Sequence, residues 1–516
     1  MDTIVAAIRA AAGSNGPRSN GPRSNGPGSS AAEAIVEGDR RLTFPELAAA
    51  IKRTAAALVG HGVGAGDRVA IWAPNRLEWI LAALGTQYLG AILVPLNTRF
   101  KGPEAADILA RTGAKVLFVD QGFLGTDYLG MLPEPPQVVV TLGEPVPDAA
   151  NWLEFLAAAD RTDPNDVEKL ADAVTGETVA DILFTSGTTG RAKGAMSAHR
   201  QTVGVARAWA ERAEVTGEDR YLIVNPFFHS FGSKAGYLVC LLRGATVVPQ
   251  VVFDAEASLD LIERERITLL AGAPTIYQSL LDSPTLAGRD LSSLRLAVTG
   301  AATVPTSLVV RTGEELGFRT VLTGYGLTEA VVVTMCTRGD DPETVAHTCG
   351  TAIDGLEVRI AGSGEVLVRG EHVMLGYLDD PDATAAAIDS AGWLHTGDVG
   401  VLDERGYLRI TDRIKDMFTV GGFNVYPAEV EHVLSAHPDL LEAAVVGVPD
   451  HRLGEVGRAF VRPRRGATVE EAELIAYCRE RLANYKVPRS VVTVAELPRN
   501  AAGKVLKTQL RDVIST

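Results

Sequence analysis

The segment Leu183–Gly194 has the sequence LFTSGTTGRAKG and follows directly from the apolar run VADILF. The apolar run predicts a buried strand, and the glycines after it let the backbone approach an anion closely. Backbone N–H groups and loop hydroxyls can donate to phosphate oxygens, and Lys193 adds a positive charge. The segment is not the GxxxxGK[ST] loop of P-loop NTPases, because no Ser or Thr follows the lysine. We predict a strand leading into a phosphate-binding loop, with a flexible turn as the alternative.

Outward from this loop, short β-branched runs alternate with helical segments over most of the chain. RVAIWAP precedes EWILAALGTQYLGA, and RYLIVNP and LRLAVTGA repeat the strand pattern further on. Strands alternating with helices predict α/β layers with largely parallel sheets. Near the end, strands such as AAVVGVPD and helices such as AEVEHVLSAH predict a smaller α+β domain. We place the domains at 32–411 and 412–516, with a hinge at Asp412 in the charged segment TDRIKD.

The N-terminal segment carries a short tandem repeat, SNGPRSNGPRSNGPGSS, over residues 14–30. It has no apolar side chain to bury, so we predict a disordered linker or insertion. We therefore assign residues 1–31 to an N-terminal segment and expect the folded body to begin near Ala32.

Composition excludes several classes of protein. A chain of 516 residues is too long for one compact core. Its net charge of -15 argues against a nucleic-acid surface. The four cysteines form no CxxC pair, and no apolar run approaches the roughly 20 residues of a membrane helix. With no secretory signal at the N-terminus, we predict a cytoplasmic protein without membrane insertion.

Four further segments carry residues suited to a nucleotide. In TGYGLTE (Thr323–Glu329), Tyr325 can stack on a base, Thr328 can reach a phosphate, and Glu329 is an oxygen ligand suited to magnesium. In WLHTGDVG, Asp398 can accept hydrogen bonds from two ribose hydroxyls. The others are DRIKD with the GGFNVYP that follows it, and LPRNAAGKVLK near the C-terminus. Each alone also fits a capped turn or a solvated charge.

Taken together, in this order and spacing, the motifs closely resemble the adenylate-forming superfamily of acyl-CoA synthetases, carrier-protein adenylation domains and beetle luciferases. The resemblance extends from about Ala32 to the C-terminus. It implies a large N-terminal domain of layered sheets and helices and a small mobile C-terminal domain. It also implies ATP, magnesium and coenzyme A as cofactors, with AMP released.

The resemblance assigns roles residue by residue. Lys504 is implied to touch the carboxylate and the α-phosphate, Thr328 to bind the α-phosphate, Glu329 to hold magnesium, and His229 to guard the acyl pocket. The nucleotide and CoA are implied to contact Thr185, Ser186, Gly187, Thr188, Thr189, Gly190, Lys193, Gly300, Ala301, Ala302, Tyr325, Gly326, Asp398, Arg413, Lys415, Gly421 and Gly422. For His229, a hydrogen-bonded core histidine is the alternative.

Two positions depart from the family pattern. Ala192 precedes the phosphate-loop lysine where many relatives have Pro or Ser, and Ala502 stands where relatives usually carry Ser or Thr. Losing a hydroxyl beside Lys504 removes a possible phosphate hydrogen bond, worth roughly 1.5–3 kcal/mol when the partner is charged. We infer a hypothesis from this: adenylation is weakened, and the enzyme depends partly on pre-formed acyl-adenylate.

The expected acyl pocket is apolar. Phe227, Phe228, His229, Val331 and Met335 are predicted to line it, which favours a bulky hydrophobic acid over an amino acid. The segments NPFFHSFG, GAPTIYQSLLD and KDMFTVGGFNVYPAEVE are most similar to actinobacterial synthetases for steroid-ring-derived or polycyclic propanoates. A ligase for a terpenoid or polyketide acid in a natural-product or antibiotic pathway stays open, as do a luciferase-like oxygenase, a carrier-protein-loading enzyme and a non-catalytic nucleotide-binding protein. Relatives are often homodimers, which makes a dimer possible here.

Overall fold

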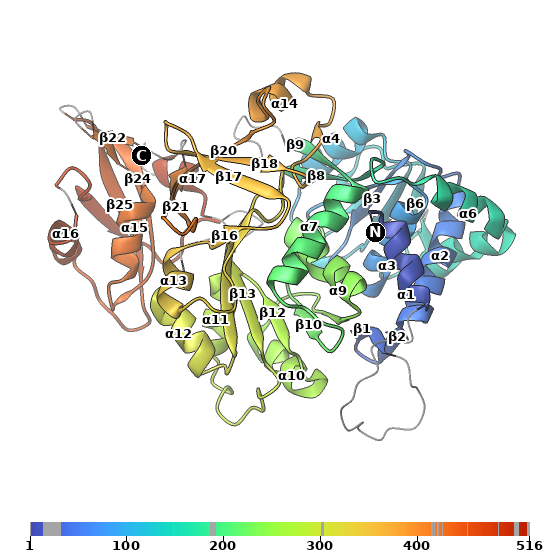
Figure 1. Ribbon diagram of the computed structural model, residues 1–516, viewed down its shortest axis with the longest axis horizontal. Coiled ribbons are helices and arrows are strands. Elements are labelled where there is room, and N and C mark those ends of the chain that lie inside the picture. The colour runs from blue at the N-terminus through green and yellow to red at the C-terminus, as the bar shows by residue number, and fades with distance from the viewer. Residues whose placement is uncertain are drawn as a thin grey trace.

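The computed structural model describes residues 2–13, 32–147, 149–185, 192–300, 304–413, 416, 418–420, 423–425, 427–450, 453–482, 484–499 and 505–512. Two large twisted sheets, A and B, make up most of the N-terminal body within these residues, and a smaller sheet C leads to the C-terminal sheet D (Figure 1).

Sheets A and B are mainly parallel. In spatial order, sheet A contains β16 (Thr351–Ala352), β15 (Thr334–Met335), β14 (Thr320–Tyr325), β13 (Leu296–Gly300), β12 (Leu269–Ala271), β10 (Arg220–Ile223), β11 (Thr246–Pro249), β1 (Glu33–Glu37) and β2 (Arg40–Thr43). Sheet B contains β19 (Gly376–Tyr377), β9 (Lys193–Ala198), β8 (Val179–Thr185), β4 (Ile92–Pro95), β3 (Arg68–Trp72), β5 (Val116–Val119), β6 (Val138–Thr141) and β7 (Ala150–Asn151).

The remaining sheets are mostly antiparallel. Sheet C contains β17 (Leu356–Ile360), β18 (Glu365–Gly370), β20 (Leu394–Leu402) and β21 (Leu408–Arg413). Sheet D contains β23 (Phe423–Val425), β22 (Phe418–Val420), β25 (Gly454–Pro463) and β24 (Leu440–Asp450), and β26 (Ser490–Thr493) pairs with β25.

Helices connect and cover these strands. The helices of the N-terminal body are α1 (Ile4–Gly13), α2 (Phe44–Gly60), α3 (Leu77–Tyr88), α4 (Gly102–Thr112), α5 (Trp152–Leu156), α6 (Pro164–Ala173), α7 (His199–Arg212), α8 (Ser230–Gly232), α9 (Leu238–Arg243), α10 (Ala255–Glu265), α11 (Pro274–Leu281), α12 (Thr306–Glu314), α13 (Pro342–His347) and α14 (Pro381–Ala387). A π-helical turn, η4 (Ser233–Tyr237), joins α8 to α9. The C-terminal part adds α15 (Pro427–Ser435), α16 (Glu471–Arg479) and α17 (Lys507–Asp512).

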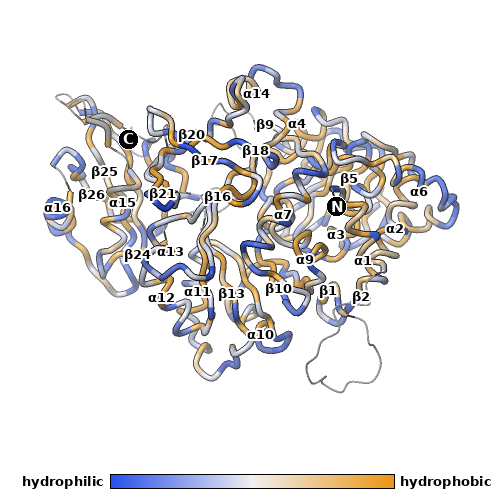
Figure 2. The backbone as a smooth tube through the Cα atoms, in the orientation of Figure 1, coloured by the Kyte–Doolittle hydropathy of each residue, from blue (hydrophilic) through white to orange (hydrophobic). Residues whose placement is uncertain are grey.

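The sequence pattern explains these layers. Every residue of α3 is buried, as expected for a helix that is apolar on all sides and lies between layers. Its Trp79 packs against Phe227 and Tyr237, with ring centroids 5.5 and 5.8 Å apart. Figure 2 shows apolar segments concentrated in the inner strands and polar ones on outer loops. The predicted α/β fold is confirmed.

The C-terminal part has a core of its own. Phe418, Val445, Phe460 and Leu510 belong to one buried cluster that is separate from the cores of the N-terminal body. His432 of α15 nevertheless faces His347 of α13, with ring centroids 5.4 Å apart. Asp412 lies in β21 opposite Val399 of β20. A hinge at Asp412 stays a prediction.

The start of the folded body was predicted wrongly. Helix α1 precedes the repeat and buries Ile4, Val5 and Ile8, so residues before Ala32 belong to the N-terminal core. The N–H of Ile4 donates to Nδ1 of the buried His199, 3.2 Å away. The apolar spacing of IVAAIRAAAG is a helical signal that the adjacent repeat obscured. The repeat itself lies outside the described residues.

In the part of the chain that the structure describes, no helix is long and apolar enough to span a bilayer.

Candidate active site

Several parallel strands of sheet A end at one edge. Leu270 of β12 lies beside Ala297 of β13, and Gly300 at the end of β13 lies beside Gly324 of β14. A Cβ on Gly300 would come within 2.4 Å of the Gly324 carbonyl oxygen, so this close approach requires glycine. Ligands of open α/β sheets bind outside the carboxyl ends of the strands. This edge is therefore the candidate active site.

Tyr325 and Asp398 meet at this edge although they belong to different sheets. The Tyr325 hydroxyl donates to Oδ2 of Asp398 at 2.5 Å. Asp398 is only 2% exposed, and its backbone is paired with that of Arg413 across β20 and β21. The structure thus brings together three positions that lie far apart in the sequence.

A second contact joins the phosphate-binding loop to Glu329. The antiparallel strands β8 and β9 place Thr185 opposite Lys193, at the two ends of the loop. Tyr377 of β19 lies opposite Ala195 of β9, and the Lys193 ammonium is 5.1 Å from the centroid of its ring. The Tyr377 hydroxyl donates to Oε1 of Glu329 at 2.8 Å.

Tyr377 is a site residue that the sequence did not reveal, because a tyrosine in GYLDD carries no motif of its own. It reaches the site only through the pairing of β19 with β9. Burial and the Glu329 carboxylate both raise the pKa of Tyr377, so its hydroxyl stays protonated and keeps donating. The tyrosine thereby fixes the orientation of Glu329.

Thr328 and Glu329 lie in a tight turn after β14. The N–H of Val333 donates to the Tyr325 carbonyl oxygen at 2.8 Å, which closes the turn. A Cβ on Gly326 would lie 2.0 Å from the Val331 carbonyl oxygen. Val331 has a φ of 65°, a conformation that a β-branched residue rarely adopts and that costs roughly 1–3 kcal/mol. Such strain is typical of turns that hold functional side chains.

The loop after β10 contains His229. This side chain keeps access to solvent, and its Nδ1 accepts a hydrogen bond from the Phe231 N–H at 3.2 Å. Surrounding protein lowers the pKa of His229 and favours the neutral ring. A residue that combines solvent access with such an environment lines a cleft. Among its neighbours in sequence, Phe228 is partly exposed.

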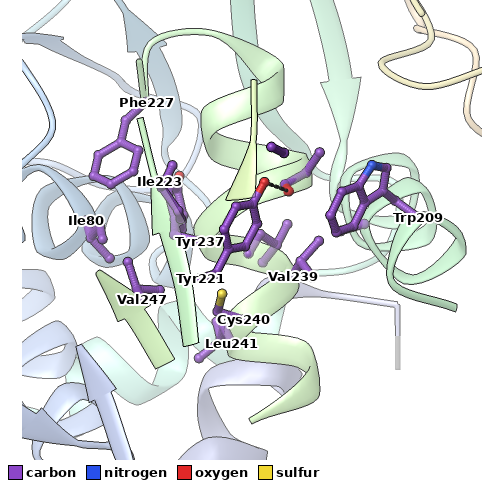
Figure 3. Close-up of a cluster of buried hydrophobic side chains, with 14 of the residues drawn as sticks. Ile80, Trp209, Tyr221, Ile223, Phe227, Tyr237, Val239, Cys240, Leu241 and Val247 are labelled. Atoms are coloured by element: carbon purple, nitrogen blue, oxygen red, sulfur yellow. Dashed lines mark hydrogen bonds between the residues drawn. The ribbon is translucent and has the colours of Figure 1, made fainter. Parts of the chain in front are cut away.

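Phe227 and Met335 were predicted to line the acyl pocket, and this was wrong. Both have no exposed surface. The Phe227 ring packs 5.3 Å from that of Tyr237 within the buried cluster in Figure 3, and Met335 is enclosed because β15 lies inside sheet A. Alternate residues on a loop or strand face opposite ways, which the pattern FFHSF alone did not resolve.

Comparisons with known proteins agree with this geometry. The profile of the AMP-binding enzyme family matches residues 25–378, and that of the AMP-binding enzyme C-terminal domain matches residues 429–504. The chain belongs to the AMP-binding enzyme family.

Similar proteins include two CoA ligases named for 3-[(3aS,4S,7aS)-7a-methyl-1,5-dioxo-octahydro-1H-inden-4-yl]propanoate. The one from Rhodococcus jostii is 56% identical over 489 residues, covering 93% of this chain and 95% of the relative. The one from Mycobacterium tuberculosis is 56% identical over 485 residues, with the same coverage of each chain. Among solved structures, ATP-bound MatB from Rhodopseudomonas palustris superposes with a TM-score of 0.85 at 30% identity, covering 99% of this chain and 98% of that one.

Family membership confirms the sequence-based predictions of fold, of an acid–thiol ligase and of ATP and CoA as cosubstrates. In this AMP-binding enzyme, the described site residues are Thr185, Lys193, Gly300, Tyr325, Gly326, Thr328, Glu329 and Asp398. Arg413 is described in its backbone only. Ser186, Gly187, Thr188, Thr189, Gly190, Ala301, Ala302, Lys415, Gly421, Gly422 and Lys504 lie outside the described residues.

The residues present fit a magnesium ion held together with a nucleotide. Magnesium commonly takes one or two protein carboxylates and completes its shell with phosphates and water. Glu329 offers one oriented carboxylate on the same side of the site as Lys193. No cluster of three or more His, Cys, Asp or Glu side chains suited to a metal occurs among the described residues, so an all-protein cage is not what this part of the chain offers.

Replacing Tyr377 by phenylalanine should weaken the response to magnesium. The ring would still pack beside Lys193, but Glu329 would lose the hydrogen bond that orients it. Loss of such an outer contact typically reduces metal affinity or activity by about tenfold or more. The measurement is acid-dependent pyrophosphate release over a magnesium titration. Tyr407→Phe is the matched control, because that hydroxyl bonds Asp340 instead. An unchanged magnesium dependence in Tyr377→Phe would contradict the role.

Proposed function

We propose that this AMP-binding enzyme converts a polycyclic propanoate to its CoA thioester through a bound acyl-adenylate. Two ligases that are 56% identical to it are named for a dioxo-octahydroindenyl propanoate. The observation that carries the proposal is the meeting of Lys193, Tyr377 and Glu329 beside the Tyr325–Asp398 pair at one sheet edge.

In the first half-reaction, a carboxylate oxygen attacks the α-phosphorus of ATP, and the bond to pyrophosphate breaks. The carboxylate and the triphosphate repel each other, so cationic donors are needed at this point. Lys193 and the loop after β8 hold the β- and γ-phosphates, Thr328 binds the α-phosphate, and Lys504 contacts both reactants. Magnesium, when bound at Glu329, offsets charge on the phosphates.

The nucleoside is held on the other side of the cleft. Tyr325 stacks on the adenine, which Gly300, Ala301 and Ala302 also line. Asp398 accepts hydrogen bonds from the ribose, and Arg413 lies opposite it in the ladder. Asp398 already accepts from Tyr325, and its second oxygen and remaining lone pairs allow further acceptance.

In the second half-reaction, the CoA sulfur attacks the acyl carbon, the bond to AMP breaks, and the thiol proton is lost to solvent. The small domain rotates about Asp412, which removes Lys504 and brings Gly421 and Gly422 to the pantetheine. Rotation lets one site serve two reactions with different requirements. The separate core of the small domain supports movement as a unit.

The acid lies against Phe228, His229 and Val331. These are the predicted pocket residues that keep exposed surface in the described structure. A panel of acids tests the function: polycyclic propanoates, medium-chain and long-chain fatty acids, aryl acids and amino acids, each with ATP, magnesium and CoA. We expect AMP and acyl-CoA by mass spectrometry chiefly from polycyclic propanoates. Turnover of amino acids alone, or of none, would refute the proposal.

Restoring a hydroxyl beside the C-terminal lysine should strengthen adenylation. Ala502→Thr would allow a further hydrogen bond to a charged phosphate, which corresponds to about a tenfold or greater gain. The measurement is ATP–pyrophosphate exchange with a polycyclic propanoate, compared with thioester formation from synthetic acyl-adenylate. We expect only the exchange to rise. Equal exchange in both proteins would dispose of the idea that the enzyme depends on pre-formed acyl-adenylate.

Two further expectations accompany this function. We place the enzyme in the cytoplasm, where ATP and CoA are available, and we keep the homodimer as a prediction. Light scattering coupled to gel filtration distinguishes a monomer from a dimer.

A further inference from the structure

A pocket lies beside the candidate active site, on the side away from the nucleotide. It contains about 300 Å³ not filled by protein atoms, part of it open to solvent, and α3, β4, β8, α7 and η4 contribute to its walls. Leu93, Leu183 and Leu238 make one part of the lining apolar. Asp181, Thr202 and Lys234 make another part polar.

The pocket adjoins both halves of the site. Leu183 stands two residues before Thr185, on the strand that leads into the phosphate-binding loop. Ser233 follows His229 by one turn, and both its N–H and its hydroxyl donate to the His229 carbonyl oxygen at 3.0 Å. Lys234 is one residue further on, about 7 Å along a helix axis from His229 at 1.5 Å per residue. That span suits a short acid side chain followed by a ring.

The polar part is a buried ion pair. The Lys234 ammonium lies 2.8 Å from Oδ1 of Asp181, and the two side chains are only 4% and 2% exposed. The ammonium also donates to the Ser197 hydroxyl at 2.9 Å, while the Thr202 hydroxyl donates to Asp181 at 3.1 Å. Burying two charges is costly, and apolar residues of similar volume are often as stable. Stability alone therefore does not explain the pair.

Lys234 has spare donor capacity. An ammonium has three N–H donors, and the residues that the structure describes give Lys234 two partners, Asp181 and Ser197. Because Asp181 balances its charge, the pair is neutral overall. A neutral acceptor preserves that balance, whereas a second carboxylate or an ammonium on the ligand would bury an uncompensated charge. The pocket therefore suits a ketone or similar oxygen on an otherwise apolar ring.

Resting on the proposed function, we propose that Lys234 selects the acid by donating a hydrogen bond to a ring ketone, with Asp181 and Ser197 as positioning residues. Lys234 lies in η4, and π-helical turns frequently occur at functional sites. A site built to hydrogen-bond a substrate group discriminates strongly against analogues that lack it.

The test compares two acids on two proteins. The acids are the dioxo-octahydroindenyl propanoate of the named relatives and the ring-deoxygenated analogue of the same skeleton. Lys234→Met alone would leave Asp181 buried without its cation, so the variant used is Lys234→Met with Asp181→Asn, which removes both charges and leaves an acceptor for Thr202. Lys115→Met with Asp67→Asn is the matched control, because that ion pair of 2.8 Å or less is half-exposed and distant in role.

We expect the unmodified enzyme to prefer the dioxo acid in kcat/KM by about tenfold to 100-fold, as for one buried hydrogen bond to a charged donor. In the double variant this preference should fall to near unity through loss of activity on the dioxo acid, with the deoxygenated acid still adenylated. An equal preference in both proteins would overturn the role of Lys234. Failure of the unmodified enzyme on both acids would instead overturn the proposed function. Assays with the two mono-oxo acids identify which ketone Lys234 binds.

Discussion

Replacing Lys504 by alanine is expected to suppress acyl-adenylate formation while preserving thioester formation from a supplied acyl-adenylate. Lys504 is proposed to contact both the attacking carboxylate and the α-phosphate. Removing one positioned donor to developing charge typically lowers the rate by about 10²–10³-fold. The measurement pairs ATP–pyrophosphate exchange with acyl-CoA formation from synthetic adenylate and CoA.

The contrast between the two assays makes this result informative. A merely destabilised protein would lose both half-reactions together, whereas a lysine that leaves the site after adenylation affects only the first. Lys169→Ala, at an exposed lysine of α6, serves as the control. Equal losses in both assays, or no loss in either, would contradict the proposed alternation of the small domain.

Replacing Glu329 by glutamine should reduce adenylation by a comparable factor, about 10²-fold or more, because the neutral amide is a poor magnesium ligand. The substitution keeps an oxygen that can accept from the Tyr377 hydroxyl, so the local fold should persist. The loss should be partly offset at high magnesium. Pyrophosphate release over a magnesium titration measures both effects.

The Glu329 result has its own control and its own failure. Glu404→Gln removes an exposed carboxylate from sheet C and should leave the magnesium dependence unchanged. Full activity of Glu329→Gln at ordinary magnesium concentrations would exclude Glu329 as a metal ligand. Together with Tyr377→Phe, the series separates holding the metal from orienting its ligand.

Local patterns predicted much of the fold. The helix expected from Leu47, Ile51, Ala55 and Leu58 is α2, and these four side chains are buried. Alternating strands and helices gave the parallel sheets, since each signal lies within a few residues of chain. Helix α1 escaped notice because its short apolar pattern stands beside a repeat that suggested a linker.

Pocket residues were harder to predict than nucleotide-binding ones. Phe227 and Phe228 are equally apolar neighbours, yet one is buried against Tyr237 and the other is partly exposed. Lys234 was not singled out, because a lysine next to the motif has no sequence feature that indicates burial. Its partner Asp181 lies 53 residues earlier, on a strand that otherwise reads as apolar.

The amino-acid sequence by itself determined the family, the α/β layers and the loops that carry Lys193, Tyr325, Glu329 and Asp398, because motifs and periodicity are local properties of the chain. Only the tertiary structure decided that Tyr377 orients Glu329 and that Lys234 faces Asp181 in a pocket. Those contacts join strands and helices that are distant in sequence, and strand pairing and packing between layers create them.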